Sequence, residues 1–389
     1  MKIVKLIVKN AMRHKLRTVL TATGIAIAIF AFSLLSTVID AYFTGVNSSS
    51  NTRLVTRNRV SLSFSMPLAY EEKIAKLPGV TNVSISQWFG ATYIDRKNFF
   101  AQFAVEPGKF LPLFPEYILS EKEKSDFLKQ RNSCIVGAKL AEKYGWKPGD
   151  TFRLVGTIFP GNWDFVIRGI YHGADKGTNE TTMFFHWKYL DESLRQTAPS
   201  RAGNVSGFYV GIADPEKASE ISRQIDAMFN NSLAETKTES EREFRMQFVS
   251  MVGTIITAIR IISIVVVAII LLVMANTMAM TARERVHEYA VLKTLGFRPK
   301  HIVGLIFGES GLIAVSGGIL GLMITVPLTH AFARFLTDTL GNFFPIFELS
   351  ETTVIFAFVS SLLVGVLAAI FPTLYAVKTR IADGLRYIG

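Results

Sequence analysis

Four long segments with almost no charged residues constrain the fold of this chain more than any other feature. They cover residues 18–39, 261–282, 302–328 and 352–377, and the only acid or base among them is Glu309. A helix needs about 20 apolar residues to cross the roughly 30 Å hydrocarbon core of a membrane, so each segment is long enough. A mean hydropathy of +0.32 is also unusual for a soluble protein. The sequence therefore predicts four transmembrane helices.

Charges in the short connections predict how these helices are oriented. Residues 1–17 carry six Lys/Arg and no acid, the 283–300 link carries five Lys/Arg, and the 378–389 tail carries three. Short basic flanks remain in the cytoplasm, which places both termini and this link inside. In the 330–351 loop the acids outnumber the single Arg, so this loop is predicted to face outward. Orientation accounts for much of the net charge of +11, and no nucleic-acid partner is needed to explain it.

The N-terminal region leaves two alternatives open. The first apolar segment could be a signal peptide, but it is longer than a usual signal core and no small-residue cleavage motif follows it, which favours an uncleaved anchor. Residues 1–17 alternate apolar and basic side chains at helical spacing. That pattern favours an amphipathic helix in the inner membrane interface, with a frayed basic tail as the alternative.

Residues 41–244 lie between the first two spans and are long enough for a full extracytoplasmic domain. The stretch at 133–156, SCIVGAKLAEKYGWKPGDTFRLVG, is typical of a strand, a short helix, a turn and a second strand. The six His show no paired metal-binding or catalytic spacing, and one Cys excludes an intrachain disulfide. The predicted fold is a membrane α-helical protein with four transmembrane helices and a large α+β extracytoplasmic domain between helices 1 and 2.

The second span is longer than a membrane requires. Apolar helical periodicity begins near Arg245 and runs to the end of the 245–282 segment, which is roughly 57 Å of helix. A stalk beneath the outer domain is predicted, with Arg260 near the outer interface. Gly253 is the only interruption, so the alternatives are one continuous rod, which we favour, or two helices with a bend at Gly253.

A charged helix is predicted in the cytoplasmic link at 283–300, between two membrane spans. Its apolar residues recur at helical spacing, and Gly296 is a typical helix stop. The apolar set is Val286, Tyr289, Ala290, Leu292 and Leu295. By spacing alone, this helix could equally be a docking element or an ordinary amphipathic loop helix with headgroup contacts.

The third span combines small residues with one acid, Glu309. Gly304, Gly308, Gly317, Gly318 and Gly321 allow close helix approach, either within the chain or between two chains. A carboxylate in a membrane span is costly, so Glu309 should either reach the inner interface or pair with a basic group such as Arg17. The predicted order is 1–17 interfacial helix, 18–40 first span, 41–244 outer domain, 245–282 stalk and second span, 283–300 link, 301–329 third span, 330–351 outer loop, 352–377 fourth span and 378–389 tail.

The segment NTMAMTARERVHEYAVLKTLGFRPKHIVGLIFGESGLIAVSGGILGL resembles the signature of the MacB/LolC/LolE/FtsX-type ABC transporter permeases, also called type VII or mechanotransmission permeases. His287 and Tyr289 depart modestly from the family pattern. The tail FPTLYAVKTRIADGLRYI and the start NAMRHKLRTVLTATGIAIAI resemble the family ends. The matching positions in the central signature are Asn276, Glu284, Arg285, Glu288, Leu292, Lys293, Leu295, Gly296, Glu309, Gly317, Gly318 and Gly321.

The resemblance implies that the link is a coupling helix that docks in a groove of a cytosolic ATPase. The chain contains no GxxxxGK[ST] phosphate loop, so two copies of a separate ATPase subunit would bind ATP and Mg, and this chain would be non-catalytic and hold no cofactor or metal. MacB carries a fused ATPase domain, which makes the LolC/LolE, FtsX and DevC-type layouts the better match. The implied coupling residues are Arg283, Glu284, Arg285, Glu288, Leu292, Lys293, Leu295 and Gly296.

The resemblance also implies a second permease chain, identical or paralogous, in contact through the first two spans, with membrane lipids and a periplasmic adaptor or lipoprotein as further partners. The expected protein is a permease subunit in a bacterial inner membrane. It would couple ATP hydrolysis by its partner to movement of the periplasmic domain, for export or extraction of a lipid, lipoprotein, peptide or small molecule. The alternative is an FtsX-like signalling protein that activates a cell-wall hydrolase. A membrane-anchored enzyme is disfavoured because no catalytic set is apparent.

Overall fold

The computed structural model describes residues 2–95, 98–175, 177–340 and 347–382, with backbone only at 2–6 and 334–340. The chain divides into two compact units. One is helical and holds the ends of the chain and the segment Gly253–Arg334, and the other holds Tyr42–Val252. Each unit has its own hydrophobic core.

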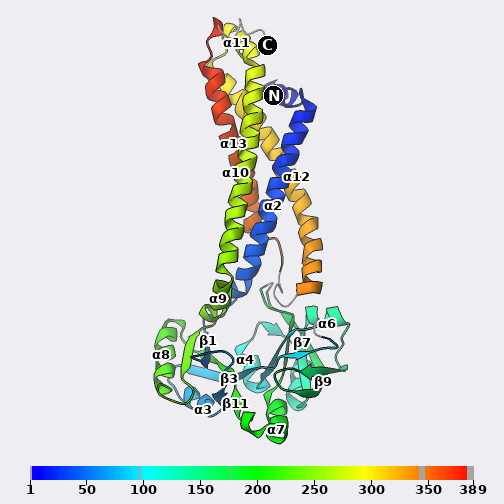
Figure 1. Cartoon of the computed structure of the whole chain (residues 1–389), viewed down its shortest axis with the longest axis vertical. Helices are drawn as coiled ribbons and strands as arrows, with labels where there is room; N and C mark the ends of the chain where they lie inside the picture. The colour runs from blue at the N-terminus through cyan, green and yellow to red at the C-terminus, as the bar shows by residue number, and fades with distance from the viewer. Residues whose placement is uncertain (1, 96–97, 176, 341–346, 383–389) are drawn as a thin grey trace. The chain divides into compact units, whose positions relative to one another are not determined.

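Among its described residues, the helical unit contains four helices long and apolar enough to cross a membrane. They run alongside one another, and α11 lies at the end of the bundle that also carries the N-terminal helix α1 (Figure 1). The four-helix prediction is therefore confirmed. The four long helices are α2 (Lys15–Asn47), α10 (Gly253–Glu284), α12 (Pro299–Leu340) and α13 (Glu351–Lys378), and the two short ones are α1 (Lys2–Ala11) and α11 (Val286–Thr294).

Several helix boundaries differ from the predicted ones. The interfacial helix expected over residues 1–17 ends at Ala11, and α2 already begins at Lys15, so a short turn separates them. Helix α12 reaches Leu340 instead of ending at residue 329. Pro327 lies inside α12 without ending it, which is a common feature of membrane helices because neighbouring groups can satisfy the freed carbonyl. Part of the tail, residues 383–389, lies outside the described residues.

Glycines on one face of α12 allow it to approach α2 closely. A Cβ atom added at Gly317 would lie 2.8 Å from the Ala22 carbonyl oxygen, and one at Gly321 would lie 2.8 Å from the Ala26 carbonyl oxygen. Real Cβ atoms do not approach backbone oxygens this closely, so any larger residue would push the two helices apart. These two glycines therefore serve packing within the chain.

The other small residues of α12 have different neighbours. A Cβ atom at Gly318 would meet the Ser361 hydroxyl of α13 at 2.5 Å, and one at Gly308 would meet Ile7 of α1 at 2.5 Å. At Gly304 a Cβ atom would meet nothing within 4 Å. Helix α12 thus packs against three different helices of its own chain, through glycines on more than one face.

The outer unit is an α+β domain built on one long mixed sheet, as predicted. The strand order is β13-β1-β12-β3-β5-β10-β7-β9-β8-β4, with β10 parallel to β5, β7 parallel to β9 and the other neighbours antiparallel. The strands of this order are β1 (Arg53–Asn58), β3 (Val80–Trp88), β4 (Ala91–Thr92), β5 (Ala101–Val105), β7 (Ser133–Gly137), β8 (Thr151–Gly156), β9 (Gly161–Gly173), β10 (Thr182–His186), β12 (Gly207–Ile212) and β13 (Thr236–Ser240).

Short elements complete the outer unit. They are β2 (Met66–Pro67), β6 (Tyr117–Ile118), β11 (Asn204–Val205), α3 (Tyr70–Ala75), α4 (Pro107–Leu113), α5 (Glu121–Lys129), α6 (Ala138–Tyr144), α7 (Trp187–Thr197), α8 (Ala218–Met228) and α9 (Glu241–Met251). Alternation along the strands buries a dense aromatic core, in which Phe89 contacts Trp163 at a ring distance of 5.2 Å and Phe185 at 5.0 Å. These aromatic contacts pack the sheet tightly in the core of the outer unit.

The predicted continuous stalk helix is interrupted. Helix α9 ends at Met251 and α10 begins at Gly253, and the Val252 amide donates to the Val249 carbonyl in a tighter single turn. The continuous rod is therefore wrong, and the alternative of two helices that meet at Gly253 holds.

The base of α9 is bonded to the outer unit, which explains why this segment does not simply extend α10. Arg53 is 2% exposed and pairs with Glu241 at 2.7 Å, and Glu241 in turn pairs with Arg245 at 2.6 Å. Arg245 also donates to the Gly45 carbonyl at 3.2 Å. Arg260 is exposed on α10, and its position at a membrane interface stays a prediction.

Candidate functional site

The link between α10 and α11 is a sharp helical corner at Arg285. This residue has non-helical backbone angles (φ −106°, ψ 11°), so the chain leaves α10 after Glu284 and starts a new helix at Val286. At the other end, Gly296 has φ +85°, a conformation that favours glycine. The Phe297 amide donates to the Leu292 carbonyl and the Gly296 amide to the Lys293 carbonyl, each at 3.1 Å. This is a Schellman motif, and it ends α11 at Gly296.

One face of α11 is packed into the helical unit. Val286, Tyr289 and Ala290 are each about 5% exposed or less. Leu295 is 70% exposed, so its assignment to this buried face is wrong: it follows the last helical turn and points away. The opposite surface combines charge with exposed apolar side chains. Its exposed members are Arg283, Glu284, His287, Val291, Leu295 and Phe297, and we call them the docking face.

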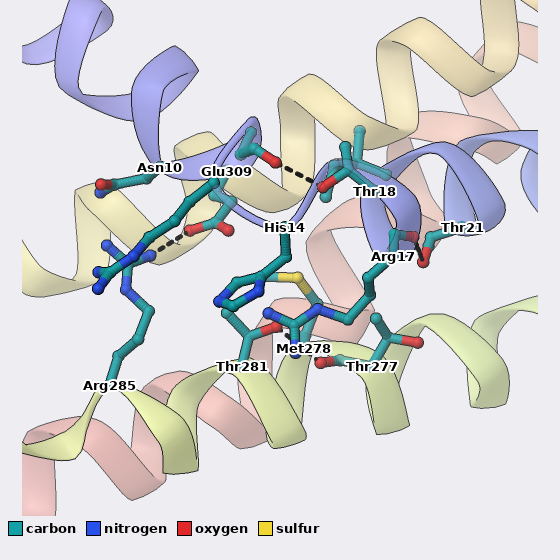
Figure 2. A pocket seen from close by; sticks show the side chains of 13 residues that line it. Asn10, His14, Arg17, Thr18, Thr21, Thr277, Met278, Thr281, Arg285 and Glu309 are labelled. Atoms are coloured by element: carbon teal, nitrogen blue, oxygen red, sulfur yellow. Dashed lines mark hydrogen bonds and ion pairs between the residues drawn. The ribbon is translucent and has the colours of Figure 1, made fainter.

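Arg285 points inward, although the resemblance placed it among the docking charges. Its side chain is 9% exposed, and its guanidinium donates to the Glu309 carboxylate of α12 at 2.9 Å. It also donates to Glu288 at 3.0 Å, one turn along α11. Figure 2 shows the Arg285 side chain reaching toward Glu309. The corner of the link is therefore bonded to the third span by a buried ion pair.

Two arginines near the start of α2 extend this cluster. Arg13, in the turn between α1 and α2, pairs with Glu288, and Arg17 pairs with Glu284 at 2.8 Å. The prediction that Glu309 pairs with a basic group is therefore confirmed, but its partner is Arg285, whereas Arg17, the example given for that group, pairs with Glu284. The chain of ion pairs joins the N-terminal segment, α10, α11 and α12, and we call it the corner cluster: Arg13, Arg17, Glu284, Arg285, Glu288 and Glu309.

A narrow cavity adjoins the corner cluster (Figure 2). Its volume is about 10 Å³, which is room for one water molecule. Thr21 donates to the Arg17 carbonyl at 2.9 Å, so its hydroxyl is already satisfied on this wall. The cavity is too small for a substrate, and its role is structural. The side chains labelled around it are Asn10, His14, Arg17, Thr18, Thr21, Thr277, Met278, Thr281, Arg285 and Glu309.

Lys293 also turns toward its own chain. Its ammonium group donates to the carbonyl oxygens of Ala376 at 3.0 Å, Val377 at 3.0 Å and Thr379 at 2.7 Å. Ala376 and Val377 are among the last residues of α13, whose carbonyls have no partner within the helix, and Thr379 directly follows it. A cation there is also favoured by the helix dipole. Lys293 therefore bonds α11 to the end of the fourth span, and its part in coupling stays a prediction.

The charge states of this site follow from its contacts. Burial alone would raise the pKa of Glu288, but the bonds from Arg13 and Arg285 outweigh it and hold that pKa below its usual value. Burial raises the pKa of Tyr289 to about 12, so its hydroxyl stays protonated at neutral pH.

Among the described residues, no three His, Cys, Asp or Glu side chains gather as metal ligands. What the arrangement can do is hold α11 rigidly while presenting its docking face.

Comparison with known proteins identifies the family. A family model described as a MacB-like periplasmic core domain matches residues 18–228, which is more than half of the chain. A second, described as an FtsX-like permease C-terminal domain, matches residues 260–381. The chain belongs to the MacB/FtsX family of ABC transporter permeases. The second match contains α11 and the whole corner cluster except the part contributed by the N-terminal segment.

Individual relatives of this permease are distant. An uncharacterized ABC transporter permease of Methanocaldococcus jannaschii, MJ1507, is 22% identical over 97% of this chain and 96% of its own length. LolC of Haemophilus influenzae, a lipoprotein-releasing system transmembrane protein, is 26% identical over 65% of this chain and 64% of its own length. An uncharacterized permease of Mycobacterium tuberculosis, Rv0987, is 24% identical over 68% of this chain, which spans only 30% of that protein.

Solved structures of outer domains are similar to part of this permease. The extracellular domain of YknZ, a noncanonic ABC-type transporter from Gram-positive bacteria, matches 48% of this chain and all of its own length, with 13% identity and a TM-score of 0.36. The periplasmic region of MacB from Actinobacillus actinomycetemcomitans matches 53% of this chain and 95% of its own length, with 8% identity and a TM-score of 0.37.

Proposed function

We propose that this permease couples ATP binding and hydrolysis by a separate cytosolic ATPase to movement of its outer domain. The observation that supports it best is the way α11 is held. Its buried face, the Arg285–Glu309 pair and the Lys293 bonds attach it to α12 and α13. A short helix fixed at this many points passes a push on its free face to the spans instead of absorbing it. Permease subunits of this family are in general non-catalytic, which fits a mechanical role.

The docking face has the composition of a protein interface. Leu295 and Phe297 are 70% and 42% exposed, and charged Arg283 and polar His287 are exposed at the other end of the docking face. Exposed apolar side chains surrounded by polar ones are typical of a surface that a partner covers. Two copies of an ATPase that binds ATP and Mg would meet two permease chains, identical or paralogous. A periplasmic adaptor or lipoprotein and membrane lipids complete the proposed assembly.

The orientation proposed for this membrane protein places α11 and both termini in the cytoplasm of a bacterium and the outer domain in the periplasm. The basic residues around α1 and α11 support it, because these two helices lie at the same end of the bundle (Figure 1). The proposed activity is export, or extraction from the outer leaflet of the inner membrane, of a lipid, lipoprotein, peptide or small molecule.

The proposal is tested by purifying the tagged chain from native membranes in mild detergent and identifying its partners by mass spectrometry. We expect an ABC ATPase, lost in the Leu295→Glu variant. Leu233→Glu is the matched control, because Leu233 is fully exposed in the outer unit and away from the docking face. Retention of the ATPase by Leu295→Glu would show that α11 does not dock it. Recovery of an ATPase with a cell-wall hydrolase, and no effect on any cargo, would favour the signalling function instead.

A further inference from the structure

The outer unit contains a large cavity on one face of its sheet. Alternating residues of neighbouring strands form its floor, because side chains two apart on a strand share a face. The pairing register places Arg57 opposite Gly207, Gly207 opposite Ser86, and Trp88 opposite Phe103. The floor thus runs across β1, β12, β3 and β5, and all of these residues line the cavity.

Apolar side chains form much of the walls. Phe244 and Phe248 lie one turn apart on α9, with ring centroids 5.2 Å from each other, and Ile158 and Phe159 come from the turn between β8 and β9. The cavity measures about 800 Å³, and small-molecule sites are typically about 300–1,000 Å³. We call this cavity the aromatic pocket. Its size and lining suit a small molecule with a ring or an alkyl chain.

Of the described residues that line the aromatic pocket, the charged ones are two arginines, and none is a carboxylate. Arg57 is already bound within the protein, at 3.1 Å to Glu239 and 2.9 Å to Gln247. Arg201 is exposed at the rim, where it donates to the Ile158 carbonyl at 2.7 Å and lies 4.5 Å above the Phe159 ring. Among the described residues, these contacts of Arg201 include no acid, and a guanidinium has five N–H donors. Most of its donors are therefore free for an anion.

We propose that the aromatic pocket binds a small anionic amphiphile, a carboxylic acid with an alkyl or aromatic body. The apolar body lies on Trp88, Phe103 and Phe248, and the carboxylate accepts hydrogen bonds from Arg201 at the rim. The binding does not depend on the proposed transport function, whereas a role of this ligand as cargo rests on it. A cation is disfavoured because only positive charge faces the site.

The test uses the full chain in nanodiscs of uncharged lipid, without ATP or any partner. The probe is a twelve-carbon fatty acid that carries a photoreactive diazirine, and labelled peptides are identified by mass spectrometry. We expect labelling of peptides from the pocket floor and from α9, saturable by unlabelled dodecanoate. Arg201→Gln should weaken the apparent affinity about tenfold, since a hydrogen bond to a charged group is lost.

Two controls isolate the charge. Arg223→Gln removes an exposed arginine of α8, outside the pocket, that bonds only within its own helix among the contacts described, and should leave the affinity unchanged. The methyl ester of the probe should bind wild type and Arg201→Gln equally. Labelling confined to the membrane helices, or equal loss in both arginine variants, would overturn the proposal. The labelling experiment contains no ATPase, so its result does not depend on the proposed function. If the pocket is labelled but no ATPase partner is recovered from cells, only the proposed function is refuted.

Discussion

Removing Glu309 should destabilise the helical unit far more than removing an exposed acid of the same cluster. Glu309 and Arg285 are 8% and 9% exposed and 2.9 Å apart, and breaking one partner of a buried pair costs roughly 3–5 kcal/mol. Arg285 retains Glu288 at 3.0 Å, so we expect Glu309→Leu to cost about 3 kcal/mol, the lower end. The control is Glu284→Leu. The Glu284 side chain, which pairs with Arg17, is 38% exposed, so this change should lower the free energy of unfolding by less than about 1 kcal/mol.

The assay is SDS titration of the purified chain in mixed micelles, which gives the free energy of unfolding for each variant. The double variant Glu309→Leu with Arg285→Met removes both charges and leaves no buried ion unpaired. It should therefore recover most of the stability lost in Glu309→Leu, as when a buried pair is replaced by apolar residues. Glu288 would keep Arg13 in that variant. A double variant as unstable as the sum of its two single variants would refute the reasoning.

Three further predictions follow from individual contacts. Glu288→Lys places a third cation beside Arg13 and Arg285, so stimulation of the partner ATPase should fall at least about tenfold. Membrane insertion should persist. Normal stimulation would contradict a coupling role for α11. Gly321→Ala should lower the unfolding free energy because its Cβ would meet α2, whereas Gly304→Ala, in open space, should be neutral or stabilising in the same SDS titration. Burial lowers the pKa of His186 below 6.5, so only the unfolded chain gains this proton as the pH falls through 6.5. The melting temperature should therefore be lower at pH 5.5 than at pH 7.5. This difference should be smaller in His186→Gln. An equal drop in both proteins would assign the effect to other groups.

The large elements were predictable because they follow from composition and period. Long uncharged runs indicate the four spans, and alternating patterns around Pro-Gly and Gly-Asp turns indicate the α+β domain. Gly296 was predictable as a helix stop for a local reason, since its positive φ favours glycine. Each of these features depends on residues close together in the sequence.

The contacts of the corner cluster were not predictable in the same way. Arg285 lies at a break between two helices, so neither helical period gives its direction, and its partner Glu309 is on another helix. The partner of Lys293 was not predictable either, because nothing near it in the sequence indicates that it bonds the end of α13. The stalk interruption has a similar origin. Helical periodicity continues through Val252, but bonds from Arg53 and Arg245 hold α9 to the outer unit.

The close approach of α12 to α2 has a consequence for assembly. Gly317 and Gly321 form the stripe of small residues that would most readily dimerise in a membrane, and α2 already occupies it. Two copies of this chain cannot share a glycine seam there without first separating those helices. Exposed faces with bulkier side chains, such as those of Val19 and Ile27 on α2 and Ile264 on α10, remain available for contact between two copies. Contact between two copies through these faces would leave the glycine contacts between α12 and α2 intact.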